Sequence, residues 1–89
     1  MKYRWKITKI LDEYGRPDLH HYVGVEGPAN ASDDTEMPWE FRMTDDDGLL
    51  WVYGTCSHEE FFPLEDFGMP GFGCTQIEYK QSNGKWEML

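Results

Sequence analysis

The sequence predicts a small all-β protein, an antiparallel sandwich or a partly open barrel of five to six strands with at most one short helical turn. Two observations support this class: short segments alternate apolar and polar residues, and Gly-containing turns separate them. A third is the aromatic content of four Trp, five Tyr and five Phe in 89 residues, enough to fill one modest core. We therefore expect a single β domain over residues 1–89.

The centre of the chain is predicted to form a β-hairpin. Residues 39–44, Trp-Glu-Phe-Arg-Met-Thr, alternate with the period of a strand that has one buried and one solvated face. Residues 49–53 form a second apolar run. Between them, residues 45–48 (Asp-Asp-Asp-Gly) provide turn formers, with Gly supplying a positive φ.

Four further segments have strand character. Residues 2–8 alternate cations with rings, and residues 19–25 alternate His and Tyr with aliphatic side chains. Residues 74–80 alternate again, and Asn83-Gly84 is the strongest short hairpin signal, so residues 86–89 are predicted to return as the last strand.

The remaining segments interrupt this pattern. Residues 9–11 break the alternation, which predicts a bulge or burial on both sides. Residues 27–38 have no apolar period and are predicted to form a long loop. Ser57-His58-Glu59-Glu60 fits a capping box that opens one helical turn, which Pro63 ends. The aromatic segment Phe61–Phe72 is predicted to form a lid over one end of the core.

The charge distribution suggests the kind of partner. The chain carries 17 acids and 8 bases, a net charge of −9, and residues 17–66 hold thirteen of the acids against Arg42 alone. A segment of this charge repels nucleic acid and anionic membranes and attracts basic proteins. We therefore expect no direct nucleic-acid or membrane partner. The sequence leaves the oligomeric state open.

The sequence gives no signal for secretion or membrane insertion. It has no apolar run near the ~20 residues of a membrane span, and charged residues alternate with apolar ones from Lys2 onward, unlike a signal peptide. The predicted location is the cytoplasm, where Cys56 and Cys74 are expected to be reduced thiols.

The sequence offers two candidate metal sites. Zinc could be bound by Cys56, His58 and Cys74 with His20 or His21, but no pair has the spacing of a zinc knuckle. Calcium at the Asp-Asp-Asp-Gly turn would require a Glu at the twelfth position, where a Cys stands. No cofactor is expected, and zinc remains an alternative.

Catalysis and nucleic-acid binding are disfavoured by strand geometry. Ser57, His58 and Glu59 are the residue types of a hydrolase triad, but neighbours on an extended chain point apart, so no enzyme is predicted. A single-strand platform needs rings and cations on one face, whereas the period of residues 2–8 separates the two.

The acidic residues of the central segment form the predicted partner-binding site. They lie on the long loop, on the hairpin turn and beside the aromatic lid: Asp33, Asp34, Glu36, Asp45, Asp46, Asp47, Glu59, Glu60, Glu65 and Asp66. A small, acidic, β-rich chain without catalytic residues resembles, in composition and size, the phage-encoded DNA mimics that include anti-CRISPR and anti-restriction inhibitors. The resemblance implies an inhibitor or adaptor that binds a basic surface of a nucleic-acid-handling complex.

A small-ligand binding domain is the main alternative function. In that hypothesis the lid Phe61–Phe72 closes over a barrel mouth lined by Trp39, Trp51 and Tyr53. A solid core at this place would contradict it.

Overall fold

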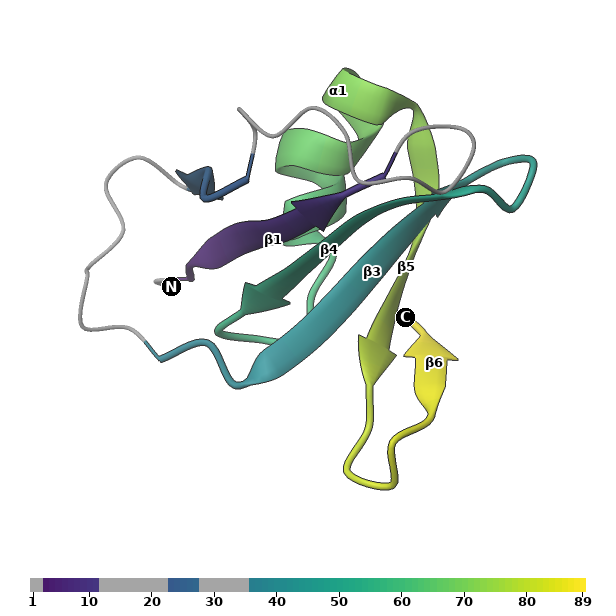
Figure 1. The fold of residues 1–89 in the computed structure, drawn as a ribbon. Coiled ribbons are helices and arrows are strands. Elements are labelled where there is room, and N and C mark those ends of the chain that lie inside the picture. Colours follow the sequence, from purple (N-terminus) through teal and green to yellow (C-terminus); the bar gives the residue numbers. More distant parts are fainter. Residues whose placement is uncertain (1–2, 12–22, 28–35) are drawn as a thin grey trace.

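The computed structural model describes residues 3–11, 23–27 and 36–89, and it contains one antiparallel sheet (Figure 1). The strand order is β2-β1-β4-β3-β5-β6. The strands are β1 (Trp5–Ile10), β2 (Glu26–Gly27), β3 (Trp39–Asp45), β4 (Leu50–Cys56), β5 (Cys74–Lys80) and β6 (Trp86–Met88). The predicted antiparallel, mostly β class is confirmed.

The sheet is open, with β2 and β6 at its two edges. Among residues 3–11, 23–27 and 36–89 it neither closes into a barrel nor packs on a second sheet, and a helical segment covers one of its faces (Figure 1). A helix laid across a sheet buries the apolar face as a second sheet would. Within the described residues, no helix has the length and apolar character needed to cross a membrane.

The helical segment is longer than predicted and begins later. It comprises the π-helical turn η2 (Leu64–Gly68) and α1 (Met69–Phe72), whereas Ser57–Glu60 forms no helix. Pro63 occupies the N-cap position of η2 and does not end the helix. A proline is tolerated there because the first N–H groups of a helix have no intrahelical acceptor. Gly73, with φ 69°, ends α1 in the left-handed conformation.

The predicted hairpins are present, and bulges change which side chains of a strand point to the core. β3 and β4 pair across the Asp-Asp-Asp-Gly turn, where Gly48 has φ 80°. The register shifts between Ile7 and Lys9, which confirms the predicted bulge in β1. A second shift pairs Met43 with Val52 and Thr44 with Leu50, so Trp51 is the extra residue of β4.

The core lies between the sheet and the helical segment. Its fully buried side chains come from all four long strands and include Ile7, Phe41, Met43, Ile77 and Tyr79. Phe41 and Tyr79 are register partners and meet edge to face at 6.0 Å. The alternation in the sequence therefore identified the buried face of β3 and of residues 5–7 in β1, whereas in β5 it placed buried Cys74 with the polar side chains, and for β4 it gave no face.

Close packing requires two glycines. A Cβ at Gly54 would lie 2.4 Å from the Lys6 carbonyl oxygen and 2.4 Å from the Phe41 ring. A Cβ at Gly68 would lie 2.5 Å from the Met43 sulfur. The first glycine lets β1 and β4 pair above a phenyl ring, and the second brings the helix against the sheet.

Residues 19–22 of the predicted strand and residues 28–35 of the predicted loop lie outside the described residues. In the described part of that strand the prediction is wrong, because Val23 and Gly24 form a turn, with φ 93° at Gly24, and β2 is Glu26–Gly27 instead. The Val25 carbonyl accepts a hydrogen bond from the Ile7 N–H at 2.9 Å, so this segment does reach β1.

Candidate functional site

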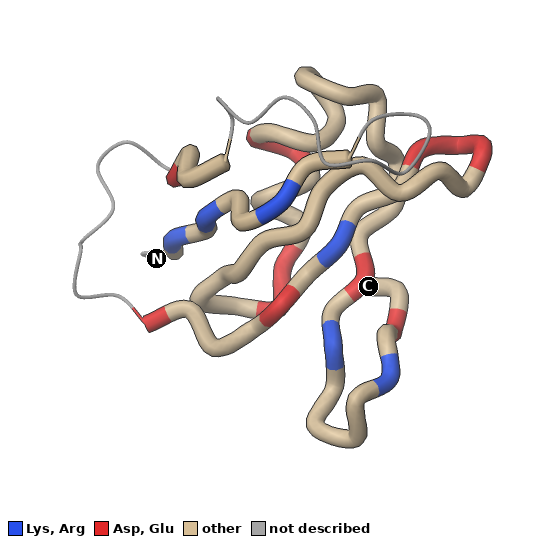
Figure 2. Tube along the Cα trace, in the orientation of Figure 1, with Lys and Arg blue, Asp and Glu red and all other residues tan. Residues whose placement is uncertain are grey.

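The structure distributes the predicted acidic site over several places. Asp33 and Asp34 lie outside the described residues, and Glu36 precedes β3 by three residues. The hairpin turn with Asp45–Asp47 stands at the other end of β3, as a separate acidic segment (Figure 2). The pair Glu59 and Glu60 follows β4, and Glu65 and Asp66 lie on η2. These residues therefore do not form one continuous patch.

Asp45 is fixed by three hydrogen bonds. Its Oδ1 accepts the backbone N–H groups of Asp47 and Leu49 at 2.9 and 3.0 Å, and its Oδ2 accepts the Trp51 indole N–H at 2.8 Å. The indole bond, with the two backbone bonds, lowers the pKa of the Asp45 carboxyl. Asp45 thus stays ionised and holds the turn on which Asp46 and Asp47 are exposed.

Asp66, which lies near the start of the helical segment, is also fixed by hydrogen bonds. Its Oδ2 accepts the Tyr3 hydroxyl at 2.8 Å and the Trp5 indole N–H at 3.1 Å. The hydrogen bond to Asp66 raises the pKa of Tyr3 to about 12, because the phenol proton is held by a carboxylate. Here too a tryptophan and a neutral donor fix an anionic group.

A series of aromatic rings connects these two carboxylates. Trp5 contacts Phe67 at 5.6 Å between ring centroids, Phe67 contacts Phe72 at 5.5 Å, and Phe72 contacts Trp51 at 6.0 Å. The rings come from β1, η2, α1 and the bulge of β4. Asp45 and Asp66 are therefore both attached to the helix-covered side of the sheet, through one packed aromatic layer.

The other predicted acids differ in exposure and contacts. Asp46, Asp47 and Glu65 are exposed. Glu59 accepts a hydrogen bond from the Gln81 amide at 2.7 Å, and the Glu60 carbonyl accepts the Tyr79 hydroxyl at 2.6 Å. Glu36 is exposed too, so the exposed acids of the predicted site, apart from Asp66, are Glu36, Asp46, Asp47 and Glu65.

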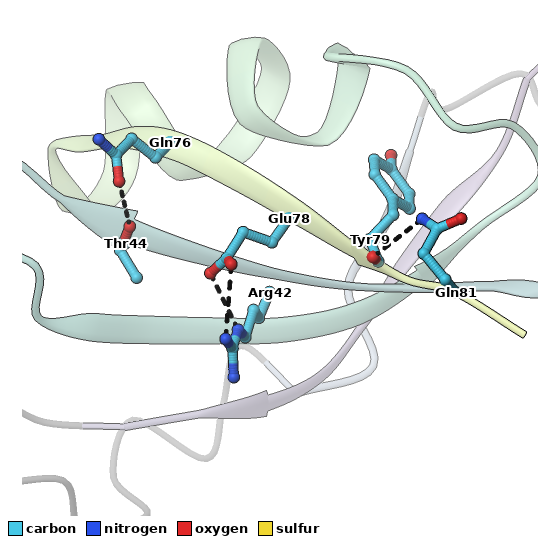
Figure 3. A network of polar contacts seen from close by, with 6 residues as sticks. All are labelled: Arg42, Thr44, Gln76, Glu78, Tyr79 and Gln81. Atoms are coloured by element: carbon cyan, nitrogen blue, oxygen red, sulfur yellow. Dashed lines mark hydrogen bonds and ion pairs between the residues drawn. The ribbon is translucent and has the colours of Figure 1, made fainter. Parts of the chain in front are cut away.

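Basic residues lie on the other face of the sheet. The period of two places Lys6, Arg42 and Lys80 opposite the buried side chains, and Figure 3 shows Arg42 and Glu78 on the side of the sheet away from the helices. Arg42 Nε lies 3.0 Å from Glu78 Oε1, and Lys80 Nζ lies 3.6 Å from Glu40 Oε2. Among the described residues, the acids that form ion pairs are thus not those of the predicted site.

The zinc alternative is incompatible with the strand register. Cys56 pairs with Trp39 at the start of β3, whereas Cys74 pairs with Asp45 at its end. Six residue steps along a strand span about 20 Å, too far for two ligands of one ion or for a disulfide. Within the described part of the chain, no group of three or more potential ligands is close enough to hold a metal.

Both thiols are buried in the core. Desolvation raises the pKa of Cys56, and it raises the pKa of Cys74 to about 12.

The prediction that the Ser57 and His58 side chains point apart is wrong. Ser57 Oγ lies 2.8 Å from His58 Nδ1, and it accepts the Arg4 backbone N–H at 2.9 Å. The chain bends after β4, so neighbouring side chains turn toward each other there. The Glu59 carboxylate accepts a hydrogen bond from Gln81, so Ser57, His58 and Glu59 do not form the relay of a hydrolase triad.

The aromatic lid does not cover a barrel mouth. Phe62, Phe67 and Phe72 pack against the core, Trp51 joins them, and Tyr53 lies on the uncovered face. Trp39 alone of the three predicted mouth residues lines a pocket of about 470 Å³, which lies between the start of β3 and the β5–β6 hairpin. The pocket's other lining residues are Pro38, Glu40, Lys80, Gln81, Ser82 and Gly84.

Sequence reasoning missed the roles of two tryptophans. Trp5 is buried in the core, and Trp51 was expected at a ligand mouth; each also donates its indole N–H to a carboxylate of the predicted site. An aromatic residue six positions after the first Asp of a turn was the available signal. Comparison of the chain with protein-family models, curated proteins and solved structures finds no match.

Proposed function

We propose that the protein is a non-enzymatic inhibitor or adaptor that uses acidic residues to bind a basic surface of a nucleic-acid-handling complex, as DNA-mimicking anti-CRISPR and anti-restriction proteins do. One observation carries the proposal. Among the described residues, the ion pairs use Glu26, Glu40 and Glu78, and none of the eight described acids of the predicted site. Their charge is therefore not neutralised by the described bases and can act on a partner.

The separation of charge across the sheet supports this use. Two packed layers are about 10 Å apart, and the Debye length at physiological ionic strength is about 8 Å. Bases on the uncovered face are thus largely screened from Glu65 on the helix side. A partner that approaches the helix side or the hairpin turn meets mainly negative charge.

Preorganisation is the second support. Asp45 fixes the hairpin turn through two backbone N–H groups and an indole, so Asp46 and Asp47 are presented on a defined loop. A preformed site loses less conformational entropy on binding than a flexible acidic tail. In this proposal Asp46, Asp47 and Glu65 contact the partner, and Asp45 and Asp66 are positioning residues.

The test is competition with DNA. Purified CRISPR effector and restriction complexes bind labelled DNA in the presence of increasing amounts of the protein, over a range of salt concentrations. We expect at least one complex to lose its DNA, with a potency that falls as salt rises. Asp46→Asn combined with Asp47→Asn should lower that potency about tenfold or more, as expected for loss of close interfacial charge pairs.

The matched control changes the net charge equally on the other face. Glu40→Gln combined with Glu78→Gln also removes two negative charges, but from residues paired to Lys80 and Arg42. We expect this control to inhibit as the unmodified protein does. Equal loss in both double variants would mean that only net charge matters, and failure to displace DNA from every complex would contradict the proposal.

A further inference from the structure

The uncovered face of the sheet carries a continuous row of side chains across five strands. Register pairs Lys9 with Tyr53, Tyr53 with Arg42, Arg42 with Glu78 and Glu78 with Met88. Lys9 Nζ lies 5.8 Å from the centre of the Tyr53 ring. The row therefore combines cations with an aromatic ring at neighbouring positions.

A second ring extends this row toward β6. Trp86 lies under the Arg42 guanidinium at 4.6 Å and meets Tyr53 edge to face at 6.2 Å. The two rings come from different strands and share one face with Arg42. Single-strand platforms in proteins combine such rings with cations on one sheet surface.

The charge of this face is opposite to that of the chain. Strand period and register place Arg4, Lys6, Lys9, Arg42 and Lys80 on it, against Glu26, Glu40 and Glu78. Five bases and three acids give a local charge of +2, in a chain with a net charge of −9. An anionic ligand is therefore the complement of this face.

The sequence argues against a single-strand platform because rings and cations alternate along residues 2–8, so that they lie on opposite faces. That separation applies only within one strand. In β1 the rings do lie opposite the cations, since Trp5 is buried while Lys6 is on the other face. The adjacent strand β4 supplies Tyr53, and the edge strand β6 supplies Trp86, to the face that carries the β1 lysines. Rings and cations are thus brought together by the sheet and not by the strand.

The pocket of about 470 Å³ adjoins one end of this face, because Glu40 and Lys80 belong to both. Its lining combines the Trp39 indole and Pro38 with the polar groups of Gln81 and Ser82. Pockets of roughly 300–1,000 Å³ accept small molecules, and one planar base with its sugar is within that range.

We propose that this face and its pocket bind a short segment of single-stranded nucleic acid. Its phosphates interact with Lys6, Lys9 and Lys80, and its bases stack on Tyr53 and Trp86. A duplex is disfavoured because its bases are stacked inside and cannot reach the rings. An acidic peptide would satisfy the cations but lacks planar groups to stack on these rings.

The acids on the helix side do not prevent this binding at physiological salt. They lie beyond a layer of about 10 Å, more than the Debye length of about 8 Å. Their repulsion is felt mainly at low ionic strength, where it opposes attraction by the face. Asp46→Asn combined with Asp47→Asn should therefore leave oligonucleotide affinity unchanged or raise it, which separates this proposal from the proposed function.

The test is fluorescence anisotropy with labelled oligothymidylate and oligouridylate, which distinguish DNA from RNA as the source of the ligand. We expect a dissociation constant of about 1–100 μM at physiological salt, as for non-specific binding. Lys6→Gln combined with Lys9→Gln should reduce the slope of log affinity against log salt by about 1.4, since each lost phosphate contact contributes about 0.7.

Two comparisons isolate the face. Met69→Glu combined with Gly71→Glu changes the net charge equally at exposed positions of α1 and should leave binding unchanged. Tyr53→Phe should retain binding, whereas Tyr53→Leu should weaken it about fivefold or more, the effect of losing one stacked base.

Three outcomes would overturn the proposal: no binding of either oligonucleotide at low salt, equal loss in the lysine and α1 variants, or equal binding of labelled polyglutamate, which would assign the face to acidic peptides.

Discussion

The two faces of the sheet hold their charged residues in different ways. On the helix-covered side, Asp45 and Asp66 accept indole N–H groups from Trp51 and Trp5, and no described base neutralises them. On the uncovered face, Glu40 and Glu78 are paired with Lys80 and Arg42. Neutral donors fix a carboxylate in place without cancelling its charge, whereas an ion pair does both. The comparison explains how one small chain can present an anionic side and a cationic side.

The largest expected effect concerns the packing that holds the covered side together. Gly54→Ala should destabilise the protein by about 1–3 kcal/mol, because its Cβ would meet the Lys6 carbonyl and the Phe41 ring. Gly71→Ala is the control, since a Cβ there meets nothing within 4 Å. Urea unfolding followed by tryptophan fluorescence measures both. Similar stability of the two variants would show that β1 and β4 are not packed closely over Phe41.

A second prediction concerns the hydroxyl donor to Asp66. The pKa of Tyr3 is about 12 in the folded protein, against 10.0 for an ordinary tyrosine, so the folded state retains the proton more strongly. The stability that this proton provides is present below pH 10 and is lost as pH rises from about 10 to 12. Tyr3→Phe should flatten this part of the stability curve, and the protein minus variant absorbance difference should titrate near pH 12. Titration of that difference near pH 10 would contradict the Tyr3–Asp66 hydrogen bond.

The smallest effect compares paired with unpaired acids. Glu78→Gln should cost up to about 1 kcal/mol, because it removes a partly exposed ion pair with Arg42. Asp47→Asn should change stability by no more than about 0.5 kcal/mol, as for an exposed side chain. Thermal unfolding at low and high salt measures both, and the Glu78→Gln effect should shrink at high salt. An equal, salt-independent cost for both variants would contradict the difference between the two faces.

Much of the sheet was predictable, because strand alternation is a local property. The hairpin at Asp45–Gly48 and the buried side of β3 follow from residues next to one another in the chain. The helix start at Pro63 was not predictable from the same rule, since proline both ends helices and begins them. The packing of that segment against the sheet depends on Gly68 meeting Met43, a contact between distant residues.

The candidate site was predictable as a set of residues but not as an arrangement. Its charge was visible in composition, whereas the use of Asp45 depends on a bulge that turns Trp51 toward the helix side. The uncovered face depends on register in the same way, because Lys9, Tyr53 and Arg42 come from three strands. Side chains brought together by pairing leave no local pattern in the sequence.

The most direct test of the account is the pKa of Asp45, measured by NMR titration of its carboxyl carbon. The indole bond and the backbone N–H bonds should hold this pKa below the ordinary 3.8, and Trp51→Phe should move it back toward that value. The stability that the ionised carboxylate provides should be present above about pH 3.8 and lost as pH falls below it. An ordinary Asp45 pKa in the unmodified protein, or one that Trp51→Phe leaves unchanged, would contradict the claim that neutral donors hold these acids in place.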